Sequence, residues 1–590
     1  MRIAVVLKDR CQPKKCQTEC LRFCPRVRGG EKTVVLDAKG KPTIAEELCV
    51  GCGICIHKCP FGSIKIIGLP AELKGEIVHQ YGENAFRLFR LPSPRPGETL
   101  GLLGPNGIGK TTVLAILSGQ LVPNLGEFQN PPGWEAAIEM FSGTELHDYL
   151  EKISQKRLVA SLKPQYVDKL PAVHKGKVRD LLKKVDEGGR MNELVALFEL
   201  EPNLDQNLTE LSGGELQRLA VAATMLRQAD VYFFDEPSSY LDINQRLKVA
   251  RIIRSLAEQK RVVVVEHDLA ALDFLADTVY LLYGSEGAYG VVGQPRSVRN
   301  AINTYLDGYM REENIRFRDW PIRFEAKAPR EDWKGTVALQ FPALYKKFKK
   351  FSLKTEAGRL RKGEVVGVVG PNATGKTTFV KMLAGELAPT RGEVELKKTV
   401  SYKPQYIKMD FTGTVGELLL SHLGGVTEDP FFKAEVEKPL ELRNLREKQV
   451  QELSGGELQR TAIALALGVK GADLFLLDEP SAYLDSNQRM EAANAIRRVM
   501  EKSGKAAFIV DHDIYFLDLV SDSIMVFEGT PSVEGRGAGP FPMREGMNRF
   551  LKMVGITFRR DADTKRPRIN KLGSRLDKEQ KEKGEYYYSD

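Results

Sequence analysis

Two glycine-rich segments of this chain have the residue types and spacing that bind phosphate. Segments 104–112 (GPNGIGKTT) and 370–378 (GPNATGKTT) fit the pattern G-x4-G-K-[ST], and each follows an apolar run. In such a loop, backbone N–H groups and a helix N-terminus hold phosphate oxygens, the lysine reaches the β- and γ-phosphates, and the next hydroxyl binds Mg2+. The chain therefore predicts two sites for ATP and Mg2+. The residues expected to bind there are Asn106, Gly107, Gly109, Lys110, Thr111, Thr112, Asn372, Gly375, Lys376, Thr377 and Thr378.

Two pairs of adjacent carboxylates lie further along the chain. The apolar runs 231–234 and 474–477 have the composition of buried strands, and they end in Asp235-Glu236 and Asp478-Glu479. Carboxylate oxygens are ligands that Mg2+ prefers. We therefore expect Asp235 and Asp478 to contact the metal ion, either directly or from just outside its ligand sphere.

One octapeptide, LSGGELQR, occurs twice, at 211–218 and 453–460. An identical eight-residue match is very improbable by chance, and the phosphate loops and carboxylate pairs surround each copy in the same order. The chain therefore contains two copies of one domain that joins strands to helices, which indicates an α/β fold.

The octapeptide and the loops around it resemble those of the ATP-binding cassette (ABC) ATPases. The resemblance implies two tandem ABC-type nucleotide-binding domains of the P-loop NTPase class. It also implies roles for three matched pairs of residues. Glu236 and Glu479 would polarise the attacking water, Gln165 and Gln405 would sense Mg2+ and the γ-phosphate, and His267 and His512 would act as switch histidines.

In that family the octapeptide completes the nucleotide site of the opposite domain. The resemblance therefore implies a monomer whose two cassettes close head to tail on two ATP molecules and open after hydrolysis. One site would combine Lys110, Glu236 and His267 with Ser454 and Gly456, and the other would combine Lys376, Glu479 and His512 with Ser212 and Gly214.

The family also stacks an aromatic side chain on adenine, upstream of each phosphate loop. Tyr81 and Phe86 are the candidates in the first copy, and Tyr345 or Phe348 in the second. Packing in the core is an equally good explanation for aromatic residues at these positions.

All eight cysteines precede residue 60, which indicates metal binding and argues against disulfides. The second run, 49–60, fits C-x2-C-x2-C-x3-C-P, and the first, 11–25, is a wider version of it. In two-cluster ferredoxins the fourth cysteine of each run binds the other cluster. That pattern assigns one [4Fe–4S] cluster to Cys11, Cys16, Cys20 and Cys59, and the second to Cys49, Cys52, Cys55 and Cys24.

A pair of zinc sites is the alternative for these cysteines, because zinc ligands also use C-x2-C spacing. The Cys-Pro endings and the total of eight favour iron and sulfur. We expect an N-terminal α+β ferredoxin-like domain that is basic and docks on phosphate. No flavin or other redox motif follows, which favours a structural role for the clusters.

The expected domain bounds follow from these motifs. They are 1–72 for the iron–sulfur domain, 73–293 for the first cassette with a helix–loop–helix insertion near 133–155, 294–335 for a charged linker, 336–528 for the second cassette, and 529–590 for a Gly/Pro hinge and basic tail. No apolar run is long enough to span a bilayer. We therefore expect a cytoplasmic protein without a membrane segment.

The head, the twin cassettes and the insertion together resemble the E subfamily of ABC proteins, the ribosome-recycling ATPases formerly called RNase L inhibitor. The resemblance covers essentially the whole chain and favours an archaeal member. It implies that ATP-driven closure splits ribosomes beside a class-1 release factor or Pelota. It also implies that the protein then stays on the small subunit, in contact with ribosomal RNA and proteins, with links to initiation factors.

Two other functions remain as alternatives. The first is an ATP-gated electron donor that uses the clusters as a relay, and the second is the soluble motor subunit of a membrane transporter.

Overall fold

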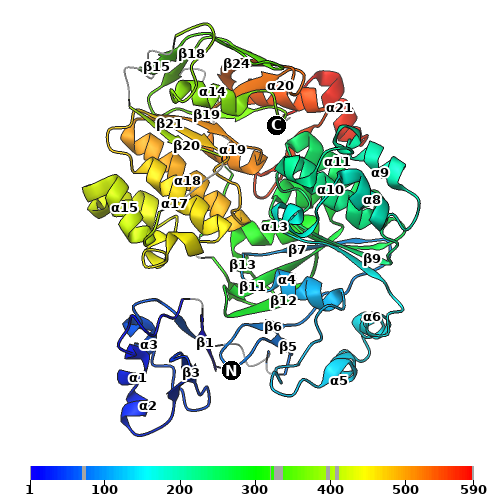
Figure 1. Ribbon diagram of the computed structural model, residues 1–590, viewed down its shortest axis with the longest axis vertical. Coiled ribbons are helices and arrows are strands. Elements are labelled where there is room, and N and C mark those ends of the chain that lie inside the picture. The colour runs from blue at the N-terminus through cyan, green and yellow to red at the C-terminus, as the bar shows by residue number, and fades with distance from the viewer. Residues whose placement is uncertain are drawn as a thin grey trace. The chain divides into compact units, whose positions relative to one another are not determined.

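The structure is a computed structural model that describes residues 2–8, 10–68, 73, 75–318, 320–324, 336–393, 399–405 and 411–587. The chain forms two compact units (Figure 1). The first contains residues 1–240, 249–267 and 275–319, and the second contains 241–248, 268–274 and 320–590.

An eight-stranded mixed sheet forms the centre of the first unit. Its strand order is β5 (Ile77–Gln80), β6 (Arg87–Phe89), β12 (Tyr289–Ser297), β11 (Thr278–Ser285), β7 (Thr99–Leu103), β10 (Arg261–Val265), β9 (Val231–Asp235) and β8 (Ala160–Lys163). Strands β8, β9, β10, β7 and β11 are mutually parallel. The apolar runs in β7 and β9 are buried along their whole length, as expected for parallel strands covered on both faces.

The helices of this unit follow the strands in the order expected for an α/β fold. They are α4 (Lys110–Leu117), α5 (Gly133–Met140), α6 (Glu145–Ser154), α7 (Leu170–Val173), α8 (Val178–Val185), α9 (Met191–Leu197), α10 (Gly213–Leu226), most of α11 (Ile243–Ala257), and α13 (Val298–Asp307).

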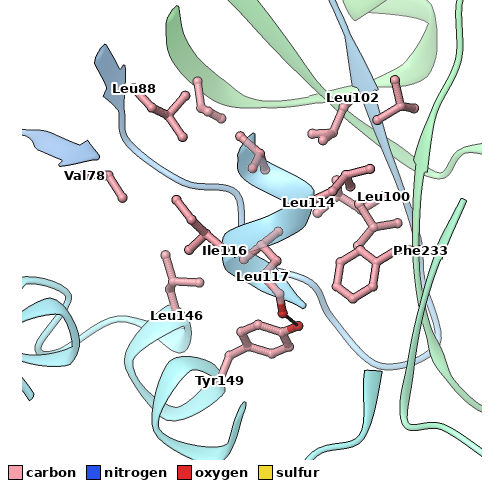
Figure 2. Packing of buried hydrophobic residues seen from close by; sticks show 14 of the residues in the cluster. Val78, Leu88, Leu100, Leu102, Leu114, Ile116, Leu117, Leu146, Tyr149 and Phe233 are labelled. Atoms are coloured by element: carbon pink, nitrogen blue, oxygen red, sulfur yellow. Dashed lines mark hydrogen bonds between the residues drawn. The ribbon is translucent and has the colours of Figure 1, made fainter. Parts of the chain in front are cut away.

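The two helices α5 and α6 occupy the segment for which the sequence predicts a helix–loop–helix. Helix α6 packs Leu146 and Tyr149 onto the core beside Leu117 of α4 (Figure 2). The Tyr149 hydroxyl donates a 2.6 Å hydrogen bond to the Leu117 carbonyl. One face of the insertion is therefore part of the cassette core.

The second unit repeats the sheet strand for strand. Its order is β16 (Leu344–Lys347), β17 (Ser352–Thr355), β24 (Glu534–Pro542), β23 (Ser523–Glu528), β19 (Val365–Val369), β22 (Ala506–Val510), β21 (Leu474–Asp478) and β20 (Val400–Lys403). Its longer helices are α14 (Lys376–Leu383), α15 (Val415–Leu423), α17 (Gly455–Leu467), α18 (Ser486–Ser503), α19 (Ile514–Val520), α20 (Met543–Val554) and α21 (Arg575–Lys583), and α12 (Leu269–Leu275) belongs mainly to this unit. The prediction of two copies of one α/β domain is confirmed.

Part of the glycine-rich stretch after residue 528, which the sequence assigns to a hinge, is ordered in the second sheet. It contains β24, which lies inside the sheet between β17 and β23. A Cβ atom on Gly535 would lie 2.0 Å from the Thr374 carbonyl oxygen of the phosphate loop. Likewise, a Cβ atom on Gly290 of β12 would lie 1.9 Å from the Ile108 carbonyl oxygen. These glycines therefore allow a strand to pass close to the phosphate loop.

The expected linker and basic tail are also folded where they are described. Residues 298–307 form α13, β13 (Tyr309–Met310) pairs with β14 (Ile315–Arg316), and β25 (Phe558–Arg560) pairs with β26 (Pro567–Ile569). The rest of the linker, residues 319 and 325–335, lies outside the described residues.

Short elements form the N-terminal head. Strand β1 (Arg2–Val6) pairs antiparallel with β4 (Ile64–Gly68), and β2 (Val34–Leu36) pairs with β3 (Pro42–Ile44). The helices are α1 (Glu19–Arg22), α2 (Pro25–Arg28) and α3 (Ile54–Lys58). None of the described helices is long and apolar enough to cross a membrane.

Candidate nucleotide sites and iron–sulfur head

Both phosphate loops connect a buried strand to a helix that begins at the lysine. The first loop joins β7 to α4, and the second joins β19 to α14. Gly109 and Gly375 cap these helices with φ of 95° and 97°, a backbone conformation that favours glycine. Lys110 Nζ donates to the carbonyls of Gly104 and Pro105 at 2.8 and 2.7 Å. Lys376 makes the equivalent pair of bonds at the same distances.

The carboxylates expected to meet Mg2+ end the strands next to these loops. Asp235 ends β9 and is buried, and Asp478 ends β21 with 0 % of its surface exposed. Burial raises the pKa of both carboxyl groups, while the nearby Thr377 hydroxyl lowers that of Asp478. A buried carboxylate beside a hydroxyl suits a divalent cation, because hard oxygen donors bind Mg2+ and the cation offsets the cost of burying the charge.

Three of the predicted catalytic side chains come together in the first unit. Gln165 Nε2 donates to Glu236 Oε1 at 2.6 Å, and His267 Nε2 lies 3.6 Å from the same oxygen. Gln165 follows β8, Glu236 follows β9, and His267 follows β10, so three adjacent parallel strands deliver them.

The second unit brings the equivalent residues together in the same way. Gln405 Nε2 donates to Glu479 Oε1 at 2.7 Å, and His512 Nε2 lies 3.7 Å from that oxygen. Burial raises the pKa of Glu479 to about 7. Burial also lowers the pKa of His512 well below its usual value, so this histidine is neutral at neutral pH.

Each octapeptide forms the beginning of a long helix. Ser212 and Ser454 are the N-caps of α10 and α17, and each accepts a bond from the backbone N–H three residues later. Glu215 and Glu457 bond back to the N-cap residue, which completes a capping box. Gly214 and Gly456 lie in the first turn, where the free N–H groups of a helix attract phosphate.

The aromatic candidates separate into two kinds. Tyr81 follows β5, is 56 % exposed, and has its hydroxyl 3.1 Å from Thr112 Oγ1. Phe86 packs instead against Gly109 of the phosphate loop. In the second unit Phe348 follows β16 and is 40 % exposed, which matches Tyr81. Phe351 packs against Gly375 as Phe86 does, and the sequence-based search missed it.

The structure brings the eight cysteines together in two groups of four. A pocket that is partly open to solvent has Cys11, Cys16, Cys20 and Cys59 in its lining. The thiols that act electrostatically on Cys55 are those of Cys49, Cys52 and Cys24. Burial raises the pKa of Cys20 and of Cys55 to about 11. Bound iron offsets this cost because it favours the thiolate, so both groups fit [4Fe–4S] clusters.

Asn84 makes several of the hydrogen bonds that connect the head to the cassette of the first unit. Asn84 has φ of 50° and lies in the turn between β5 and β6. Its side chain accepts from the Ile44 N–H at 2.6 Å and donates to the carbonyls of Ala4 and Ile44. Its backbone carbonyl accepts from the Val6 N–H. Beside it, Arg87 pairs with Glu46 at 2.8 Å.

Family models agree with this geometry. The model described as "ABC transporter" matches residues 93–239 and 353–482, "4Fe-4S binding domain" matches 42–65, and "Possible Fer4-like domain in RNase L inhibitor, RLI" matches 1–32. The chain is thus a twin-cassette ABC ATPase with a ferredoxin-like iron–sulfur domain. ATP, Mg2+ and two [4Fe–4S] clusters are its cofactors, as predicted.

Similar proteins extend over the whole chain. An uncharacterised ABC transporter ATP-binding protein of Methanocaldococcus jannaschii is 53 % identical, covering 100 % of this chain and 98 % of its own. Translation initiation factor RLI1 of Saccharomyces cerevisiae is 47 % identical with the same coverage.

Solved structures agree. A chain of the "Model of ribosome-bound archaeal Pelota and ABCE1" matches with a TM-score of 0.95 and 54 % identity, covering 100 % of this chain and 99 % of its own. A second match is the archaeal ribosome recycling factor aABCE1 in complex with the ribosomal stalk protein aP1. It has a TM-score of 0.83 and 53 % identity, and the match covers 88 % of this chain and 100 % of its own. The chain belongs to the ABCE1/RLI1 family.

We expect Asn84→Ala to loosen the head. The change removes the side-chain partners of Ala4 and Ile44, and an unsatisfied buried N–H costs about 1–3 kcal/mol. Hydrogen exchange should speed up at the amides of Val6 and Ile44, while the strands of the cassette sheet keep their protection. The exposed neighbour Glu83 provides the control variant Glu83→Ala. Unchanged exchange in Asn84→Ala would show that this side chain does not hold the head.

Proposed function

We propose that this protein is an ATP-driven ribosome recycling factor. It closes its two cassettes on two ATP molecules and splits post-termination or stalled ribosomes into subunits, together with a class-1 release factor or Pelota. The observation that carries the proposal is the full-length likeness to the ribosome-bound ABCE1 chain, which includes the head as well as both cassettes. The relative bound to the stalk protein is itself described as a ribosome recycling factor.

The catalytic roles follow the convergence of side chains in each unit. Glu236 and Glu479 orient and polarise the attacking water, while Gln165 and Gln405 hold these carboxylates from the neighbouring strand. The neutral His512 accepts a hydrogen bond or donates one without adding charge. Lys110 and Lys376 neutralise phosphate charge, and bound Mg2+, held by Thr111 with Asp235 and by Thr377 with Asp478, supplies further charge stabilisation.

Each cassette lacks part of its own nucleotide site, and closure supplies that part from the other cassette. The helix N-termini at Ser212–Gly214 and Ser454–Gly456 complete the phosphate site of the other cassette, so the monomer carries its own cassette dimer. Tyr81 and Phe348 provide the aromatic faces for adenine, since both are exposed beside their phosphate loops. ATP favours the closed form, and loss of product returns the open one, which makes the motion a population shift.

The head acts as a rigid basic probe of the ribosome. Its clusters are held by Cys11, Cys16, Cys20 and Cys59, and by Cys24, Cys49, Cys52 and Cys55. Three cations, Arg22, Arg28 and Lys58, lie 5.2–5.9 Å from the ring centroid of Phe23. Cations around an aromatic ring suit phosphates and bases of ribosomal RNA on the small subunit.

We propose the domain bounds expected from the sequence, extended so that β12 and β24 belong to their cassettes. We place the protein in the cytoplasm, where ribosomes and initiation factors are found.

Sucrose-gradient sedimentation tests the proposed function. Ribosomes are incubated with this protein, Pelota or a release factor, and ATP. Free subunits should appear with ATP and intact clusters, and should be absent without the nucleotide. Intact ribosomes in a reaction that still consumes ATP would reject recycling. Reversible reduction of the clusters coupled to ATP turnover would favour the electron-donor alternative.

Glu236→Gln and Glu479→Gln should each trap a closed site loaded with ATP. Loss of a general base lowers a rate by about 100-fold or more, so the double variant should retain ATP and show almost no turnover. Phosphate release and filter retention of labelled ATP measure the two effects. The exposed Glu258→Gln serves as the control. Hydrolysis at the normal rate in both single variants would falsify the assignment.

Cysteine pairs test the cluster assignment. Cys11→Ala with Cys59→Ala removes two ligands of one cluster, so about half of the iron should remain. Cys24→Ala with Cys59→Ala damages both clusters and should leave almost none. Basal ATPase activity should survive in both variants, whereas ribosome splitting should be lost. Equal iron contents in the two double variants would contradict the exchange of Cys24 and Cys59 between the runs.

A further inference from the structure

The backbone carbonyl of each proposed catalytic glutamate accepts a hydrogen bond from a buried lysine. Lys163 ends β8 and is 0 % exposed, and Lys403 ends β20 and is 1 % exposed. Both stand two residues before the glutamine that bonds the catalytic glutamate. They belong to a repeated Lys-Pro-Gln-Tyr, in which the family resemblance gives a role to the glutamine alone.

The two ammonium groups share two equivalent hydrogen bonds, and Lys403 also donates to the Pro404 carbonyl at 3.2 Å. Lys163 Nζ donates to the backbone carbonyls of Asp235 and Glu236 at 2.7 and 3.2 Å. Lys403 Nζ donates to those of Asp478 and Glu479 at 2.7 and 3.4 Å. The targets are therefore the backbones of the metal-binding aspartate and the catalytic glutamate, in both copies.

These bonds act on a strained backbone. Glu236 and Glu479 have φ of 50° and 47°, in the left-handed region that L-residues rarely adopt. This conformation costs about 1–2 kcal/mol, and it persists only where the surroundings fix it.

Other bonds hold the same two residues from both sides. The Glu236 N–H donates to Val265 at 2.9 Å, and its carbonyl also accepts from Gln217 Nε2 at 2.6 Å. The second unit repeats the clamp with Val510 and Gln459.

Stability alone gives little reason for a lysine at this place. Burial lowers the pKa of Lys163 and lowers that of Lys403 to about 8, so the ammonium form persists at neutral pH only at a cost. Buried charged groups are often replaceable by apolar residues of similar volume without loss of stability. The negative charges of the neighbouring aspartate and glutamate raise the pKa of each lysine, and so they oppose part of the effect of burial.

We propose that Lys163 and Lys403 are positioning residues for ATP hydrolysis. The segment Lys163-Pro164-Gln165 grips Glu236 at two points, with the lysine on its backbone carbonyl and the glutamine on its carboxylate. Lys403-Pro404-Gln405 grips Glu479 in the same way. These two hydrogen bonds fix the orientation of the carboxylate toward the attacking water. They also place a positive charge next to the adjacent aspartate and glutamate. The inference rests on the catalytic roles proposed for Glu236 and Glu479.

Lys163→Met and Lys403→Met test this role, because methionine keeps most of the length without the charge or the donors. Steady-state ATPase activity is measured without ribosomes, with ATP affinity and the melting temperature of each variant. We expect kcat to fall at least tenfold in the double variant, while KM and the ATP dissociation constant stay within about twofold. Lys169→Met, an exposed lysine in the same segment, is the matched control.

A merely structural role would give the opposite pattern. The melting temperature would fall, and kcat per folded molecule would stay at the wild-type level, which would overturn the inference. Adding both lysine changes to Glu236→Gln and Glu479→Gln should lower the residual rate no further, because the carboxylate they orient is absent. If the Glu→Gln variants are inactive but the Lys→Met variants are fully active, only this inference is rejected. Active glutamine variants would reject the proposed catalytic roles first.

Discussion

The alignment of parallel strands decides where each proposed catalytic group lies. In the first unit β7, β8, β9 and β10 all end at one edge of the sheet, because parallel pairing places their carboxyl ends together. The phosphate loop follows β7, Lys163 ends β8, Asp235 ends β9, and His267 follows β10. The carboxyl edge of a parallel sheet is a recurrent ligand site for this reason. A shift in the register of any one strand would separate groups that now lie within hydrogen-bond reach.

The duplication shows which details the chemistry requires. Loop lengths, the helical insertion and the surface charges differ between the units, whereas the glutamine, lysine and histidine around each glutamate recur at nearly equal distances. The same positive φ also recurs at Glu236 and Glu479. Strain that appears twice, and is held twice by the same kinds of bond, is a property of the site. The capping boxes at Ser212 and Ser454 recur as well, which keeps both helix N-termini in a shape that suits phosphate.

Motifs in the sequence were sufficient for the α/β fold, the loops and the carboxylates, because each depends on local spacing, whereas the partition of the cysteines needed the two-cluster ferredoxin pattern. Groups whose roles depend on tertiary contacts could not be found in this way. Asn84 resembles any turn asparagine until the head packs on it. Lys163 resembles an ordinary strand lysine until its burial is known. The glycines of β24 predicted a hinge because composition does not distinguish flexibility from close packing, and here Gly535 allows the strand to pass against Thr374.

The head shows why a cluster suits a mechanical part. Its buried core contains only a few side chains, among them Ala4, Val6, Val34, Ile44 and Ile64, together with Cys20 and Cys55. A domain of this size buries too little apolar surface for rigidity, and small domains usually add metals or disulfides. Clusters bound by the two groups of cysteines would connect the two halves of the head, because Cys24 lies with the second run and Cys59 with the first. We expect a head that is cross-connected in this way to move as one body when force acts on it, whereas a loosely packed head would deform.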